Sequence, residues 1–201
     1  MSLIAMVALV SCEKEMMNYE GGNGIYFDTE GMMLDTVSVH WGLKNSDVTE
    51  QEIQLKVMLI GNVTDYDRNF SVEIETREGD DSAAIEGVHY EPILKQHTIK
   101  AGESETTIKV KLKRAPELMN KPARFAIKLV ENEELAFLYT RYGAQMVDDT
   151  TVVSRPLDYQ RAIYIDEKFP IPSWWPYYGQ QYFGDWRMQK AILICHVLEI
   201  D

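Results

Sequence analysis

The sequence predicts a mostly β protein, an antiparallel immunoglobulin-like sandwich followed by a small, aromatic-rich and partly helical C-terminal region. Three observations predict this fold. Short segments alternate apolar and polar residues, turn-forming residues separate them, and no helical segment interrupts them before residue 115. About seven such strands in about 110 residues are typical of a sandwich, and they exclude a parallel α/β fold.

The first half of the predicted sandwich holds four strands, over residues 25–27, 36–43, 53–60 and 70–76. The second strand shows the alternation well, because Val37, Val39, Trp41 and Leu43 occupy every other position. Residues at alternate positions of a strand share one face of the sheet. We therefore expect these four side chains to point into the core.

The clearest strand of the second half covers residues 107–113. Ile108, Val110 and Leu112 alternate there with threonine and lysine. Gly102 lies in the preceding turn, where a glycine tolerates positive φ. A short helical segment at 115–119 and a last strand at 124–130 complete the predicted sandwich.

The composition changes after residue 131. Residues 132–142 are compatible with a helical turn, and residues 143–156 form a polar linker. A short helix is predicted through residues 188–190, where it leads into the apolar segment 191–198. The predicted division is a signal segment at 1–12, a tether at 13–24, a sandwich at 25–131, a linker at 132–160 and an aromatic-rich region at 161–201.

The net charge of the chain is −12, from 32 acidic and 20 basic residues. A surface this acidic repels the phosphates of nucleic acids, so no nucleic-acid partner is expected. It also disfavours attachment to anionic lipid through a basic face. The ordinary role of such a charge is to keep the protein soluble.

Residues 3–10 form an apolar run that is too short to span a bilayer but suits the core of a signal peptide. The sequence LVSC at residues 9–12 resembles a bacterial lipobox, whose cysteine carries the lipid anchor. Cys12 is therefore the predicted lipid attachment site of a cell-envelope lipoprotein, in the outer membrane and facing either the periplasm or the surface. The alternative is a buried N-terminal strand with an ordinary core cysteine.

Three segments together resemble the Calx-beta repeat: GVHY at 87–90, TIKAGES at 98–104 and the strand at 107–113. The longer pattern resembles an uncharacterised family of Bacteroidetes lipoproteins, through IYF at 25–27, Trp174-Trp175, YFG at 182–184 and Lys190. The resemblance implies a Calx-beta-type sandwich in a lipoprotein that accompanies nutrient-uptake systems, and it implies no reaction.

Some Calx-beta modules bind calcium through clustered loop carboxylates, because this cation takes six to eight oxygen ligands. The candidates here are Asp65, Asp67, Asp80, Asp81 and Glu86. Their spacing does not match an EF-hand, and His89 stands where the repeat has an acidic residue. We therefore expect no metal or other cofactor, and solvated loop carboxylates are the favoured interpretation.

Aromatic residues are concentrated near the C-terminus. The candidate ligand-binding residues are Trp174, Trp175, Tyr177, Tyr178 and Trp186. Aromatic faces stack on the C–H faces of sugars, while polar neighbours bind the hydroxyls. The same residues would also pack a terminal segment against a core, and the sequence favours packing.

Catalytic motifs are absent from the sequence: the four histidines lack metal-ligand spacing, and there is no G-x-S-x-G elbow or P-loop. The chain is therefore interpreted as a non-catalytic accessory binding or interaction module of the cell envelope, with other envelope proteins or a glycan as its partner. The alternatives are a glycan-binding surface lipoprotein and a hydrolase with an unrecognised carboxylate pair.

Overall fold

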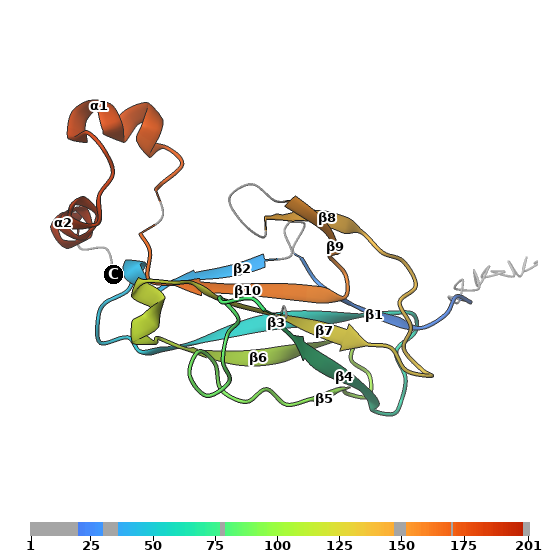
Figure 1. Cartoon of the computed structure of the whole chain (residues 1–201). Helices are drawn as coiled ribbons and strands as arrows, with labels where there is room; N and C mark the ends of the chain where they lie inside the picture. The colour runs from blue at the N-terminus through green and yellow to red at the C-terminus, as the bar shows by residue number, and fades with distance from the viewer. Residues whose placement is uncertain (1–19, 30–35, 77–78, 147–151, 170, 199–201) are drawn as a thin grey trace, which may run out of the picture.

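The computed structural model describes residues 20–29, 36–76, 79–146, 152–169 and 171–198. In this part of the chain two β-sheets face each other, a two-stranded hairpin lies beside them, and a small helical unit extends from one end (Figure 1). The structure confirms the predicted mostly β class and the sandwich. The helical C-terminal unit was also predicted.

The smaller sheet has the strand order β1-β3-β6 and is antiparallel throughout. Its strands are β1 (Gly24–Phe27), β3 (Glu50–Ile60) and β6 (Glu105–Lys113). The predicted alternation is confirmed, because Ile53, Leu55 and Val57 of β3 and Ile108, Val110 and Leu112 of β6 are buried, while the residues between them are partly or fully exposed. Ion pairs such as Lys111–Glu50, at 2.7 Å, line the outer face.

The larger sheet has the strand order β2-β10-β7-β4-β5. Its strands are β2 (Thr36–His40), β4 (Arg68–Glu75), β5 (Gln96–Ile99), β7 (Ala123–Val130) and β10 (Gln160–Asp166). The β2–β10 pair is parallel, and the other pairs are antiparallel. A parallel pair needs a long connection, and here most of the sandwich separates the two strands in sequence.

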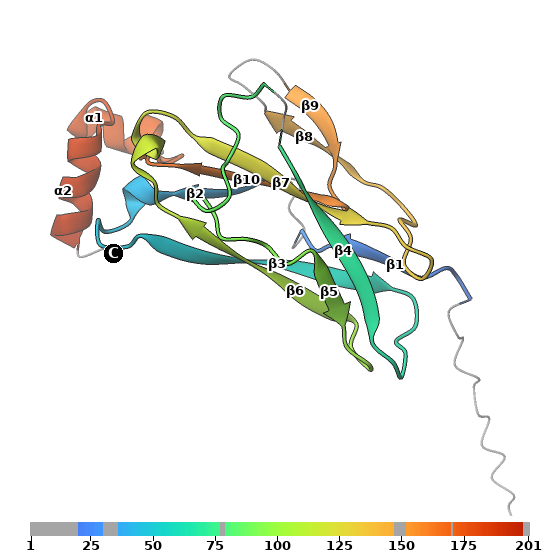
Figure 2. The same cartoon turned by 60° about the horizontal axis from the view of Figure 1, so that its bottom comes forward.

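The core lies between the two sheets (Figure 2). Tyr90 stacks on Phe125 with ring centroids 4.3 Å apart. Fully burying one large apolar side chain contributes about 1.5–3 kcal/mol. The largest fully buried apolar side chains of the sandwich come from both sheets and their connections: Ile25, Phe27, Trp41, Phe70, Ile99, Ile108, Leu112, Leu118, Ile127, Leu129 and Leu135.

The strand predicted over residues 36–43 is shorter than expected. It ends at His40, and the 3₁₀ turn η1 (Trp41–Leu43) follows. His40 pairs with Asp166, the last residue of β10, so the chain has no strand partner beyond this point. As a result Trp41 is buried as predicted, whereas Leu43 is exposed. The helical segment predicted at 115–119 is the 3₁₀ turn η2 (Pro116–Met119).

The prediction for residues 132–160 needs correction. They contain the hairpin strands β8 (Tyr142–Met146) and β9 (Val152–Pro156) instead of a helical turn and a plain linker. Strand β10 then lies between β2 and β7, so the sandwich extends past residue 131 to Asp166. Several polar residues of β10 are buried, and they contact residues that are distant in sequence. Arg161, for example, lies 5.7 Å from the Phe27 ring centroid and donates to the Asp28 carbonyl at 2.6 Å. Because such polar residues are buried, the sequence of β10 does not alternate between apolar and polar residues.

The chain leaves the sandwich after β10 and forms the C-terminal unit, with the π-helical turn η3 (Trp175–Gly179), α1 (Gln180–Phe183) and α2 (Met188–Leu198). Both views place α1 and α2 beyond one end of the sandwich (Figures 1 and 2). The short helix predicted through residues 188–190 is confirmed, and it continues through the apolar segment to Leu198. Among the described residues, none of the helices has the length and apolar character needed to cross a membrane.

Candidate functional site

The first pair of calcium candidates, Asp65 and Asp67, lies just before β4. Asp67 is bonded to the neighbouring turn: it accepts from Lys100 Nζ at 2.7 Å and from the Ala101 amide at 2.9 Å. The Lys100 bond, followed by the Ala101 bond, lowers the pKa of the Asp67 carboxyl. This carboxylate therefore holds the turn at Gly102, whose φ of 79° and position after β5 confirm the predicted reversal.

The second pair, Asp80 and Asp81, follows β4. Asp80 accepts from Arg124 Nε at 2.5 Å, from Arg124 Nη2 at 3.1 Å and from the Ser82 amide at 2.8 Å. The eight residues of β4 separate this pair from Asp67 by about 25 Å at the usual rise of a strand. Among the described residues, no three His, Cys, Asp or Glu side chains are grouped so as to hold a metal ion.

The remaining candidate, Glu86, belongs to a tight turn that ends at Tyr90. His89 stands inside this turn, where its Nδ1 accepts from the Ile85 amide at 2.9 Å. The Lys113 amide donates to the His89 carbonyl at 2.8 Å, which joins the turn to β6. The position that is acidic in the Calx-beta repeat therefore holds a buried imidazole that caps a turn.

The aromatic candidates all belong to the C-terminal unit, which we call the aromatic lobe (residues 171–198). Trp175 is its centre and is only 2% exposed. The Trp186 ring lies 4.6 Å from it, edge to face, and the Trp174 and Phe183 rings lie 5.6 and 5.8 Å away. The Trp175 indole donates to the Gly184 carbonyl at 3.1 Å. Trp175, a predicted ligand-binding residue, therefore packs the lobe and is not available to a ligand.

Polar contacts close the lobe around Trp175. The half-buried Trp186 donates from Nε1 to the Phe169 carbonyl at 3.1 Å, so it too has a packing role. Lys190, in the first turn of α2, donates to the carbonyls of Phe183 and Asp185. A Cβ at Gly179 would overlap the Trp175 ring, so only glycine permits this close approach.

The other predicted aromatic residues, Trp174, Tyr177 and Tyr178, lie on the surface of the lobe together with two residues that the sequence analysis did not select, Tyr182 and Phe183. These five side chains are 48–76% exposed. The YFG motif was visible in the sequence, but only the fold shows that its rings face outward. Five exposed rings on a lobe that is held together by its own packing and hydrogen bonds can stack on a sugar or pack against an apolar protein surface.

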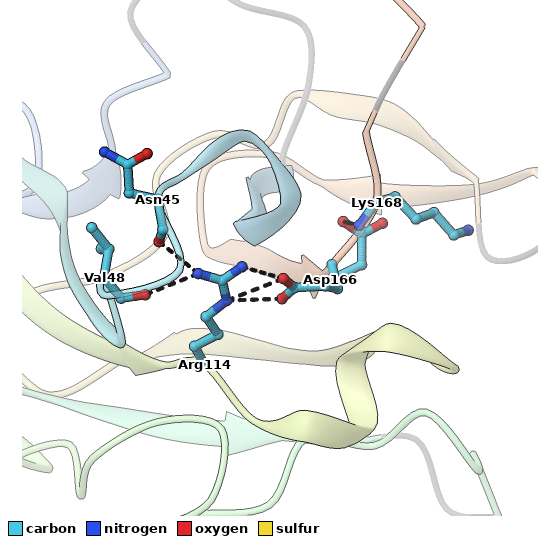
Figure 3. A network of polar contacts seen from close by, with 6 residues as sticks. Asn45, Val48, Arg114, Asp166 and Lys168 are labelled. Atoms are coloured by element: carbon cyan, nitrogen blue, oxygen red, sulfur yellow. Dashed lines mark hydrogen bonds and ion pairs between the residues drawn. The ribbon is translucent and has the colours of Figure 1, made fainter. Parts of the chain in front are cut away.

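An ion pair joins the sandwich to the chain segment that leads to the lobe (Figure 3). Arg114, directly after β6, binds both carboxylate oxygens of Glu167. Its Nη1 also donates to the carbonyls of Asn45 at 2.7 Å and Val48 at 3.3 Å. Bidentate arginine–carboxylate pairs are geometrically specific, so this contact fixes where the chain leaves the sandwich.

A second polar contact lies at the end of β10. The buried Asp166 carboxylate is 2.7 Å from His40 Nδ1 and accepts from the Lys168 amide at 3.2 Å. Neither this pair nor Arg114–Glu167 was predicted, because each joins residues more than 50 positions apart in sequence. Cys12, the predicted lipid site, lies outside the described residues.

Solved structures with a similar fold include two Calx domains. The apo form of the Calx CBD1 domain matches with a TM-score of 0.45 and 14% identity, covering 73% of this chain and 97% of that one. The Calx CBD2 domain matches with a TM-score of 0.43 and 16% identity, covering 70% and 84%.

A Bacteroides ovatus ATCC 8483 protein named "putative carbohydrate binding protein" matches with a TM-score of 0.46 and 9% identity. The match covers 74% of this chain and 38% of that protein, so the chain spans well under half of its length. No curated protein matches the sequence. The profile of the family described as "Domain of unknown function (DUF4843)" matches residues 19–200. The chain therefore belongs to this family, as the expectation of an uncharacterised family had anticipated.

Proposed function

We propose that the chain is a non-catalytic accessory module of the cell envelope, anchored by lipid at Cys12, and that its aromatic lobe binds another envelope protein. The observation that carries this proposal is the set of five exposed aromatic side chains in a lobe built on the buried Trp175, whose ring two of them contact. Clustered exposed apolar side chains mark interaction sites, and aromatic residues are enriched at the centre of protein interfaces.

The same lobe favours a protein partner because it also exposes aliphatic side chains. Ile192, Leu193 and Val197 of α2 are at least half exposed. Aliphatic side chains pack well against a protein, whereas they contribute no stacking face to a sugar. A protein surface would bury both kinds of residue.

Binding of an envelope protein by the lobe is tested by in-cell photo-crosslinking, with a benzophenone amino acid in place of Tyr182. We expect a discrete cross-linked envelope protein that disappears in the triple variant Trp174→Ala/Tyr177→Ala/Tyr178→Ala. The matched control, Tyr66→Ala/Tyr142→Ala, removes two exposed aromatic side chains outside the lobe and should leave the cross-link unchanged. An unchanged cross-link in the triple variant would count against the lobe.

The lipid anchor is supported by the apolar run at residues 3–10 and by the LVSC sequence that ends at Cys12. Metabolic labelling with palmitate should mark the wild-type chain and leave Cys12→Ala unlabelled. Equal labelling of the two chains would contradict the anchor. This result is independent of the cross-linking experiment.

A glycan is the second candidate ligand, and the exposed indole of Trp174 favours it. Trp174 lies three residues before Tyr177, whose ring is also exposed and carries a hydroxyl that can bind a sugar hydroxyl. Binding on a glycan array that is lost in Trp174→Ala and kept in Tyr66→Ala would favour this candidate. Release of reducing ends from a polysaccharide panel would contradict a non-catalytic role altogether.

A further inference from the structure

Gly24, where the N-terminal tether ends, and the aromatic lobe lie at opposite ends of the sandwich. Strand β3 spans its length: Ile60 pairs with Gly24 at the start of β1, and Glu50 pairs with Lys113 at the end of β6. The eleven residues of β3 cover about 33 Å at the usual rise of a strand. Figures 1 and 2 both show the described residues that lead into β1 on one side of the sheets and α1 and α2 on the other.

The lobe is attached at the end that is remote from the tether. Arg114 follows Lys113 directly, and it holds Glu167 through the bidentate ion pair. The Glu167 amide donates to the Leu118 carbonyl at 3.3 Å, so η2 also contacts this segment. A Cβ at Gly42 would stand 2.5 Å from the Glu167 carbonyl oxygen, which shows how closely η1 packs there.

The four tryptophans of the chain report on this remote end. Trp41 belongs to η1, and Trp174, Trp175 and Trp186 belong to the lobe or its base. Leu138 marks the opposite end, because its side chain lies 2.9 Å from a Cβ built on Gly24 and 3.1 Å from one built on Gly22. Native tryptophan emission therefore reports the lobe end, and a tryptophan at position 138 would report the tether end.

From this geometry we infer that the sandwich is a spacer that holds the lobe away from the membrane to which the N-terminus is anchored. The inference rests on the lipid anchor of the proposed function. A net charge of −12 supports an upright module, because it opposes contact of the sandwich with anionic lipid. The exposed rings of the lobe then face a protein partner across the aqueous phase and do not enter the bilayer beneath.

The test tethers the full chain to vesicles through an N-terminal histidine tag and a nickel-chelating lipid. This tether is imposed, so the result does not depend on whether Cys12 is acylated in cells. With brominated phosphatidylcholine as the quencher, we expect no loss of native tryptophan emission relative to unbrominated vesicles. The same chain tagged at its C-terminus should lose emission, since its lobe is then next to the lipid.

A reporter at the near end completes the design. Leu138→Trp, tethered by its N-terminus, should gain an emission component that brominated lipid quenches. The inference that the sandwich is a spacer is contradicted if the N-tethered wild-type chain loses as much emission as the C-tethered chain. Relief of that loss by Leu193→Asp would identify the lobe as a membrane-inserting element, and persistence of the loss would show that the sandwich lies flat on the bilayer.

Discussion

At the scale of single residues, His89 shows how a buried titratable group can organise a turn. Its Nδ1 accepts from the Ile85 amide, so the neutral ring carries its proton on Nε2, 3.5 Å from Glu117 Oε1. Burial lowers the pKa of His89, and the Glu117 carboxylate offsets part of this effect. A second proton would occupy Nδ1 and break the bond to Ile85.

The lowered pKa predicts how stability depends on pH. Above about pH 6.5, the ordinary histidine value, His89 is neutral in both the folded and the unfolded chain, so the stability it contributes is fully present. Below that value the unfolded chain binds the proton first, and stability falls as the pH drops toward the lowered pKa. Urea unfolding between about pH 5 and about pH 8 measures the free energy of unfolding across this window.

Variants separate His89 from His97, whose pKa burial also lowers. His89→Asn keeps an acceptor for the Ile85 amide but does not titrate, so its loss of stability at low pH should be smaller. Glu117→Gln removes the charge that favours the protonated ring, so its loss should be larger. A pH profile that is identical in all three chains would show that His89 does not titrate on unfolding.

At the scale of elements, the fold requires glycine at two positions, Gly102 and Gly42, for different physical reasons. Gly102 has a φ of 79° and open space around its missing Cβ, so alanine there meets only backbone strain. Gly42 has no such φ, but its Cβ would stand 2.5 Å from the Glu167 carbonyl oxygen and 2.7 Å from that of Lys168. The first glycine permits a turn, and the second permits a close approach between η1 and the end of β10.

We therefore predict that Gly42→Ala destabilises the fold more than Gly102→Ala. Strain alone at Gly102 should cost about 1 kcal/mol. The overlap at Gly42 should cost about 2–3 kcal/mol, because the two carbonyl oxygens nearest to the added Cβ belong to the backbone and cannot rotate away. Urea unfolding of both variants gives the comparison, and a larger loss for Gly102→Ala would contradict this account.

The aromatic lobe is the second element with a clear structural prediction. Trp175→Ala removes the buried ring that Trp174, Phe183 and Trp186 contact. We expect the lobe to become sensitive to limited proteolysis while the sandwich keeps its melting temperature. The matched control is Trp174→Ala, in which a half-exposed ring is lost and the lobe should stay resistant.

At the scale of the whole molecule, β10 decides where the folding unit ends. It lies between β2 and β7 in the larger sheet and contributes the buried residues Ile163 and Ile165 to the core. Without β10, β2 has no partner strand among the described residues. Losing two fully buried isoleucines removes about 3–6 kcal/mol, comparable with the whole stability of many domains.

Fragments test this conclusion directly. The fragment 25–131, which was the sandwich boundary expected from sequence, should be unfolded by circular dichroism and show no cooperative urea transition. The fragment 20–168 keeps β10 and Glu167, and should unfold cooperatively at a urea midpoint near that of the full chain. Cooperative unfolding of the shorter fragment would show that β10 is dispensable.

Local pattern alone determined much of this protein. The period-two strands β3, β4, β6 and β7 could be predicted because one face of each strand meets the core and the other meets water. The reversal at Gly102 could be predicted because glycine tolerates positive φ. The membership in an uncharacterised family also followed from short motifs that the family profile confirmed.

Only the tertiary structure decided the rest. Strand β10 carries buried polar residues whose partners are remote in sequence, as Arg161 is from Asp28, so no local pattern could reveal it. The sequence near the C-terminus does not distinguish buried from exposed aromatic residues, yet Trp175 is buried and Tyr177 is exposed. The physical reason is the same in both cases: burial and hydrogen-bond partners depend on which distant segments meet, and that is settled only when the chain is folded.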